Sequence, residues 1–150
     1  MARMHSGAKG KSGSKRPAKH IPVWAPFKEN EVEKLVVKYA KAGKEPSGIG
    51  IILRDSYGIN SVKALTGKNV TAILAENKLL AELPEDLLNL IRKMVSIKQH
   101  LEKNHHDETG HRGLILTSSK IRRLVKYYQR RKTLPMDWKL DTERLKMYLQ

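Results

Sequence analysis

Two long stretches of the chain carry apolar residues at helical spacing, and only a short polar segment separates them. Between residues 84 and 103 the apolar positions share one helical arc: Leu87, Leu88, Ile91, Met94, Val95 and Leu101. Between residues 109 and 132 the same spacing groups another set: Leu114, Ile121, Leu124, Val125 and Tyr128. Each helix must bury its apolar stripe, and the turn is too short for any arrangement but antiparallel neighbours. The pattern therefore predicts a long antiparallel helical hairpin.

The ends of the two predicted helices carry recognisable start and stop signals. Pro84 suits the first turn of a helix, and Glu85 and Asp86 follow where negative charge favours the positive end of the helix dipole. Residues 104–107 form the polar turn, and Pro135 ends the second helix because it cannot continue one.

Four shorter helices are predicted before the hairpin. The first spans residues 29–42, and Gly43 offers a left-handed stop. We expect Ser47 to cap a second helix that ends near Gly58, and Asn60 and Asn69 to cap helices at residues 61–65 and 70–77. Helices this short need one another for stability.

The fold class predicted is therefore all-α, with a long antiparallel helical hairpin, an N-terminal bundle of short helices and a basic N-terminal tail. We expect a partly extended tail at residues 1–27, a small helical domain at residues 28–80, and the hairpin domain with a C-terminal tail at residues 81–150.

The first twenty residues contain six cations and no acidic residue: Arg3, Lys9, Lys11, Lys15, Arg16 and Lys19. Such a segment cannot bury enough apolar surface to order itself. We expect an arm that orders against RNA, with a solvated tail as the plainer alternative. Residues 21–27 contain two prolines and are expected to form an extended tether in which Trp24 is an anchor.

Net charge narrows the possible partners. The chain has 30 Lys and Arg against 15 Asp and Glu, a formal net charge of +15, which favours a polyanion such as nucleic acid. A membrane partner is not expected. No apolar run is long enough to span a bilayer. A peripheral amphipathic helix would place Trp, Phe or Leu opposite its charges and need little globular core, and the pattern of this chain does not match one. Without cysteine or an apolar leader, we expect a cytoplasmic protein.

The outer side of the second long helix carries the clearest functional pattern. Its members are Arg112, Lys120, Arg123, Tyr127 and Arg130, and Arg131 extends the row. Residues 120–132 hold seven Lys or Arg and no acid, whereas a merely soluble helix would intersperse the two signs. Arginine grips phosphate with its planar fork, and tyrosine can stack on an unpaired base. The pattern predicts contact with RNA.

Other chemistry is disfavoured. His100, His105, His106 and His111 lack the spacing of a closed zinc site, so no metal or other cofactor is expected. Ser118 and Ser119 have no plausible base, and the chain has no phosphate-binding glycine loop, so it is not expected to be an enzyme. The glycines at 48 and 50 are similar to the hairpin of helix-hairpin-helix proteins, which leaves a DNA-binding accessory protein as the alternative.

Two stretches of the chain together resemble the universal small-subunit ribosomal protein S15 family, in its longer archaeal and eukaryotic form. The first covers residues 100–114 and 121–128, and includes the run from His100 through Asp107 to Leu114. The second lies in the N-terminal region, with Pro22-Val23-Trp24, Pro46-Ser47-Gly48-Ile49-Gly50 and residues 52–58. The resemblance extends over nearly the whole chain.

The resemblance implies specific roles for residues of the hairpin. His100 and Asp107 match a pair that contacts the shallow groove of an RNA helix, and Tyr127 and Arg130 match contacts to a three-way junction. Bacterial members have a serine where this chain has Gly110, so that hydroxyl contact is lost or passes to Thr109. Residues 82–85 also depart from the bacterial pattern.

The resemblance also implies partners. We expect small-subunit ribosomal RNA, neighbouring ribosomal proteins and, at the subunit interface, large-subunit RNA. The expected role is that of a structural constituent that supports subunit assembly and translation.

Overall fold

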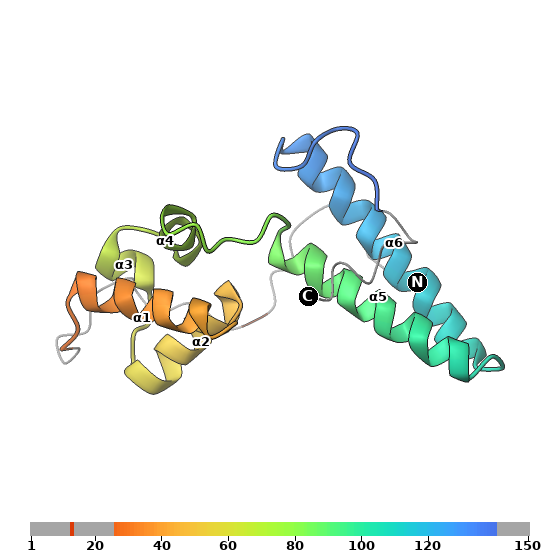
Figure 1. Ribbon diagram of the computed structural model, residues 1–150, viewed down its shortest axis with the longest axis horizontal. Helices are drawn as coiled ribbons and strands as arrows, with labels where there is room; N and C mark the ends of the chain where they lie inside the picture. The colour runs from red at the N-terminus through yellow and green to blue at the C-terminus, as the bar shows by residue number, and fades with distance from the viewer. Residues whose placement is uncertain (1–12, 14–25, 141–150) are drawn as a thin grey trace. The chain divides into compact units, whose positions relative to one another are not determined.

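The computed structural model describes residue 13 and residues 26–140, and the regular secondary structure in these residues is entirely helical (Figure 1). The predicted all-α fold class is confirmed. The described residues separate into two compact units, residues 26–82 and residues 83–140. The six cations predicted for the tail lie outside the described residues, as do Trp24 and the stretch after residue 140.

Residues 26–82 form a bundle of four helices. They are α1 (Glu29–Lys41), α2 (Pro46–Tyr57), α3 (Val62–Thr66) and α4 (Val70–Glu76), and α1 packs against each of the other three. The buried core consists of apolar side chains from every helix and one connection: Val32, Val36, Ile49, Leu53, Ile59, Val62, Leu65, Ile73 and Leu74. The four predicted helices are confirmed, and their shared core explains how such short helices are stable.

Two of the predicted caps are wrong by one or two residues. Helix α2 begins at Pro46, which fits the first helical position because its missing N–H needs no partner there, so Ser47 lies inside the helix. Ser61, rather than Asn60, caps α3, and its hydroxyl accepts a hydrogen bond from the backbone N–H of Ala64 at 3.3 Å. Gly58 ends α2 in the left-handed conformation with φ of 68°, as predicted.

Residues 83–140 contain the predicted hairpin. Helix α5 (Glu85–Lys103) and helix α6 (Glu108–Arg130) lie side by side and run antiparallel from the turn at residues 104–107 (Figure 1). Helix α6 begins one residue earlier and ends two residues sooner than predicted, and Pro84 occupies the cap position before α5. The seam between the helices is closed by buried apolar side chains: Leu87, Ile91, Met94, Val95, Ile121 and Leu134.

The segment after α6 folds back onto the open end of the hairpin, which the sequence did not predict. Lys132 adopts a left-handed conformation with φ of 58°, and this reverses the chain so that Leu134 is buried. The side-chain amide of Gln129 donates hydrogen bonds to the carbonyls of Met136 and Trp138, at 2.9 and 3.1 Å. Trp138 and Leu140 pack against the same core and cover its end.

A hydrogen bond joins the two helices at that end. The hydroxyl of Tyr128 on α6 donates to the carboxylate of Asp86 on α5, with oxygen distances of 2.7 and 2.8 Å. Burial, together with this bond to a carboxylate, raises the pKa of Tyr128 to about 12. The neutral phenol is therefore the form that the folded hairpin favours.

We expect Tyr128→Phe to lower the free energy of unfolding by about 1 kcal/mol at pH 8, because it removes this bond and keeps the ring. The folded pKa of Tyr128 is raised above that of the unfolded chain, so the contribution is present below about pH 10 and is lost as the pH rises toward 12. Denaturant unfolding measures the first effect, and phenolate absorbance shows one phenol fewer ionising near pH 12.

Tyr127→Phe, at the neighbouring exposed position, is the control and should leave the free energy of unfolding nearly unchanged, because the bond to Asp86 comes from Tyr128. Identical titrations above pH 11 for wild type and Tyr128→Phe would contradict the assignment.

Candidate nucleic-acid interface

Positive charge is concentrated on the hairpin unit. Residues 83–140 contain thirteen Lys and Arg against six Asp and Glu, whereas residues 26–82 contain nine against seven. A polyanion is therefore attracted far more strongly by the hairpin than by the four-helix bundle. The predicted site residues that the structure describes all lie on the hairpin, and they fall into a group at the tip and a group along α6.

The group at the tip centres on the carboxylate of Asp107. One oxygen accepts hydrogen bonds from the hydroxyl of Thr109 at 2.6 Å and from the backbone N–H of Gly110 at 2.9 Å, and the latter bond caps α6. The other oxygen lies 2.9 Å from Nε2 of His100 on α5. The bonds from Thr109, Gly110 and His100 hold the pKa of Asp107 well below its usual range. The group is an ionised carboxylate fixed between two helices.

Gly110 is required by the close approach at this point. A Cβ atom built on Gly110 would lie 2.8 Å from a carboxylate oxygen of Asp107 and 2.9 Å from a methyl carbon of Leu101. An added side chain therefore requires the carboxylate of Asp107 and the methyl group of Leu101 to move, because carbon atoms in contact need about 3.5 Å or more. Thr109 and Gly110 therefore both donate hydrogen bonds to the carboxylate of Asp107. Thr109 donates through its hydroxyl, and Gly110 donates through its backbone N–H.

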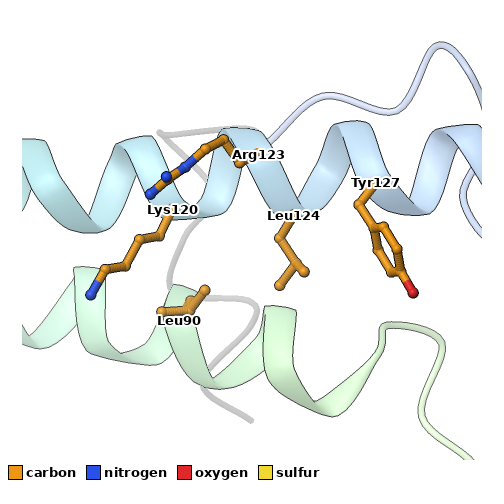
Figure 2. A pocket seen from close by; sticks show the side chains of 5 residues that line it. All are labelled: Leu90, Lys120, Arg123, Leu124 and Tyr127. Carbon is orange, nitrogen blue, oxygen red and sulfur yellow. The ribbon is translucent and has the colours of Figure 1, made fainter. Parts of the chain in front are cut away.

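The group along α6 lines a groove on one flank of the hairpin. The groove has a volume of about 380 Å³ and is lined by Leu90, Lys120, Arg123, Leu124 and Tyr127. Figure 2 shows Lys120, Leu124 and Tyr127 projecting from α6 toward the side of α5 that carries Leu90. The groove therefore combines an apolar floor with two cations and a phenol.

The position of this groove corrects the predicted geometry of α6. Lys120 and Tyr127 were predicted on the side of α6 opposite the core, yet they line the groove beside Leu124, which packs against the core. At about 100° per residue they are offset by roughly 100° and 120° from the buried Ile121. They occupy the flank of the helix, and Arg112 and Arg130 are the exposed residues that take the opposite side.

The ring of Tyr127 is exposed but held in place. Its side chain is 44% exposed, and its ring meets that of Tyr128 edge to face with centroids 5.1 Å apart. The guanidinium carbon of Arg131 lies 4.9 Å from the centre of the same ring, a cation–π contact. Arg123 is positioned by a hydrogen bond from Nε to the carbonyl of Ser119 at 3.1 Å. An exposed aromatic ring thus lies next to the guanidinium group of Arg131.

Three residues of these two groups were not among the predicted site residues. Leu124 was assigned to the core arc of its helix, and the partial exposure of Leu90 and Leu124 at the groove depends on how α5 and α6 pack. Asn104 was placed in the polar turn without a role, and the structure puts its amide on His100. The sequence signal for Asn104 was its position four residues after His100, at the end of a helix.

The structure also bears on the alternatives. Gly48 and Gly50 lie inside α2 and not in a turn, so the glycine hairpin that the DNA-binding alternative required is not formed.

Among the described residues no group of three or more histidine or acidic side chains could hold a metal ion. Nε2 of His111 instead lies 3.2 Å from the carbonyl of His105. Among the same residues, no helix is both long and apolar enough to cross a membrane.

Comparison with known proteins decides the family. A model described as the ribosomal S13/S15 N-terminal domain matches residues 1–59, and one described as ribosomal protein S15 matches residues 70–148. The chain is 51% identical over 139 residues to the small ribosomal subunit protein uS15 of Methanocella arvoryzae, covering 92% of this chain and 91% of that protein. The chain belongs to the ribosomal protein S15 family. It is also 43% identical over 151 residues to uS15 of Methanococcus vannielii, covering all of both chains.

Membership of the S15 family confirms the resemblance inferred from the sequence. The chain is a structural protein of the small ribosomal subunit, a cytoplasmic ribonucleoprotein particle, and it is not an enzyme. Ribosomal RNA and other ribosomal proteins are the corresponding classes of partner.

We predict that Gly110→Ala lowers the free energy of unfolding by about 1 to 3 kcal/mol, the usual cost of overpacking, because the added methyl group would collide with Asp107 and Leu101. Gly113→Ala, one turn along the same helix, is the matched control, since its Cβ meets nothing within 4 Å. That variant should stabilise the hairpin by about 0.5 to 1 kcal/mol through helix propensity. Denaturant unfolding of both variants measures the difference, and two stabilised variants would show that the contact at Gly110 is not tight.

Proposed function

We propose that the chain binds small-subunit ribosomal RNA at a multi-helix junction through its α5–α6 hairpin, and that this binding supports subunit assembly and translation. The observation that carries the proposal is the flank groove, which the exposed side chain of Tyr127 lines together with Lys120, Arg123 and Leu124 (Figure 2). An exposed aromatic ring among cations suits a nucleotide, whose base stacks while its phosphate is neutralised.

The tip of the hairpin is proposed to contact the shallow minor groove of an RNA helix. In A-form RNA that groove is wide and displays 2′-hydroxyl groups and base edges, which a blunt helical tip can approach. The fixed carboxylate of Asp107 can still accept a hydrogen bond from such a donor, and Thr109 and His100 surround it. Gly110 supports this contact indirectly, since it lets the carboxylate sit against the start of α6.

The long side of α6 is proposed to contact the junction. Tyr127 would stack on an unpaired base or donate a hydrogen bond to a ribose hydroxyl, and the cations would neutralise phosphates. The proposed phosphate contacts are Arg112, Lys120, Arg123, Arg130 and Arg131. Since Arg112 and Arg130 lie on the side of α6 away from the groove, we propose that they meet a different RNA strand from the one held at Tyr127.

The stiffness of the hairpin gives the binding its effect on assembly. A junction samples several arrangements of its arms, and a ligand shifts that population only by its differential affinity for one of them. Because the apolar seam fixes the tip relative to the groove, both contacts form together only when the RNA arms adopt one arrangement. The protein would thereby stabilise that arrangement for later steps of assembly.

Two further contacts are part of the proposal. Neighbouring ribosomal proteins and, at the subunit interface, large-subunit RNA are proposed as additional partners. The N-terminal cations are proposed to order against RNA, since their charge has no acidic counterpart within the first twenty residues. They are Arg3, Lys9, Lys11, Lys15, Arg16 and Lys19.

We expect Tyr127→Ala to weaken binding to a small-subunit junction RNA by about 1 to 3 kcal/mol at fixed salt, the usual loss when a base-stacking ring is removed. Ile115→Ala removes another exposed side chain from α6 and should change the affinity little. Titration of labelled RNA with each protein measures both. An affinity for Tyr127→Ala equal to that of Ile115→Ala would contradict stacking at the groove.

The cationic flank predicts a defined dependence on salt. Lys120→Gln should weaken binding to all RNA sequences alike and reduce the slope of log affinity against log salt by about 1, because one phosphate contact is lost. Lys63→Gln, an exposed lysine of α3 in the more nearly neutral unit, is the control and should leave the slope unchanged. Equal slopes for wild type and Lys120→Gln would remove Lys120 from the proposed interface.

A further inference from the structure

The imidazole of His100 has a hydrogen-bond partner at each of its two nitrogens. Nε2 lies 2.9 Å from a carboxylate oxygen of Asp107, and Nδ1 lies 3.3 Å from the side-chain nitrogen of Asn104. His100 lies in the last turn of α5, Asn104 directly follows that helix, and Asp107 directly precedes α6. Asn104 and Asp107 therefore both contact the ring of His100.

The chemistry of the two partners determines which ring nitrogen carries the proton. An ionised carboxylate only accepts hydrogen bonds, so Nε2 must donate to Asp107. The amide nitrogen of Asn104 only donates, so Nδ1 must be the bare, accepting nitrogen. A neutral imidazole has one donor and one acceptor, and this arrangement uses both. The Nε2–H tautomer satisfies every bond, and the other tautomer would break two.

The orientation of the Asn104 amide is fixed by a second bond. Its nitrogen also lies 3.1 Å from the backbone carbonyl of His100, and that oxygen can only accept. Rotating the amide by half a turn would bring its own oxygen against this carbonyl and would lose both bonds. The two hydrogens of one amide group are therefore divided between the backbone and the ring of His100.

We propose that Asn104 is a positioning residue, which fixes His100 in the Nε2–H tautomer and holds the plane of its ring at the RNA-facing tip of the hairpin. The functional part of this inference rests on the proposed function, since it assumes that the tip contacts RNA. Asn104 acts through His100, and its loss leaves the bond to Asp107 as the only one of the two contacts that opposes rotation of the ring and exchange of tautomers. A residue in the turn thus determines the orientation of the His100 ring at the tip of the hairpin.

The helical bundle offers a matched control for the helix-capping part of this contact. Asn77 directly follows α4, and its side-chain amide donates to the carbonyl of Ile73, four residues earlier, at 2.8 Å. The bond from Asn104 to the carbonyl of His100 has the same spacing. No histidine ring takes part in the contact of Asn77 with Ile73, so Asn77→Ala measures the loss of capping alone.

The first experiment examines the full chain without RNA. Nitrogen-15 spectra of histidine side chains at about pH 8.5, where histidine is ordinarily neutral, separate the bare ring nitrogen from the N–H nitrogen. Wild type and Asn77→Ala should show His100 as the Nε2–H tautomer, with Nδ1 bare. Asn104→Ala should add a measurable share of the Nδ1–H tautomer to the Nε2–H form, because only the bond to Asp107 then favours Nε2–H. Asn104→Asp, which replaces the donor by acceptors of the same size, should place a proton on Nδ1. A His100 spectrum that is the same in wild type and both Asn104 variants overturns the inference.

The second experiment measures affinity for a small-subunit junction RNA. Asn104→Ala should bind about three- to tenfold more weakly than wild type, as expected for one lost hydrogen bond, and Asn77→Ala should bind as wild type does. A changed tautomer with unchanged affinity overturns the positioning role at RNA. If wild type itself ignores the RNA, the proposed function fails, while the spectra still decide whether Asn104 fixes the tautomer.

Discussion

The apolar seam between α5 and α6 is the constraint on which the hairpin depends. Leu87, Ile91 and Val95 from α5 meet Ile121 from α6, and all four side chains are essentially excluded from solvent. Burying each such side chain stabilises the folded state by about 1.5 to 3 kcal/mol. Because the seam fixes the rotation of α6 about its own axis, it also decides which residues face outward. The flank that carries Lys120 and Tyr127 is a consequence of where Ile121 is buried.

The hairpin carries an excess of positive charge, and repulsion between like charges destabilises a compact fold. Acidic residues in exposed ion pairs would offset this repulsion little, because such pairs contribute little free energy. Two of the acids instead accept hydrogen bonds that join separate parts of the hairpin. Asp86 receives the hydroxyl of Tyr128 and joins the open end of the helices, and Asp107 caps α6 and holds His100 at the closed end. The carboxylates thus stabilise both ends of the hairpin and leave the cations of the α6 flank for a phosphate partner.

Periodicity predicted the helices and the seam well, because the spacing of apolar residues is a property of each helix alone. The caps at Ser47 and Asn60 were wrong because several neighbouring residues can cap a helix, and only the chain's path into the bundle selects one. The groove beside Leu90 and the return of Leu134 onto the core depend on contacts between elements, which no local pattern encodes. The contact of Asn104 with His100 differs from these, because a spacing of four residues at a helix end is a local signal.

The two described units differ in net charge, and this difference indicates that they contribute unequally to the attraction of RNA. Long-range attraction to RNA depends on net charge, and the bundle at residues 26–82, with nine cations against seven acids, contributes little of it. Its core of buried Val, Ile and Leu side chains stabilises the bundle, and its small net charge produces only a weak electrostatic field. Of the two described units, the hairpin therefore contributes most of the electrostatic attraction to RNA, and in the proposed function its geometry would convert non-specific attraction into selection of one RNA shape.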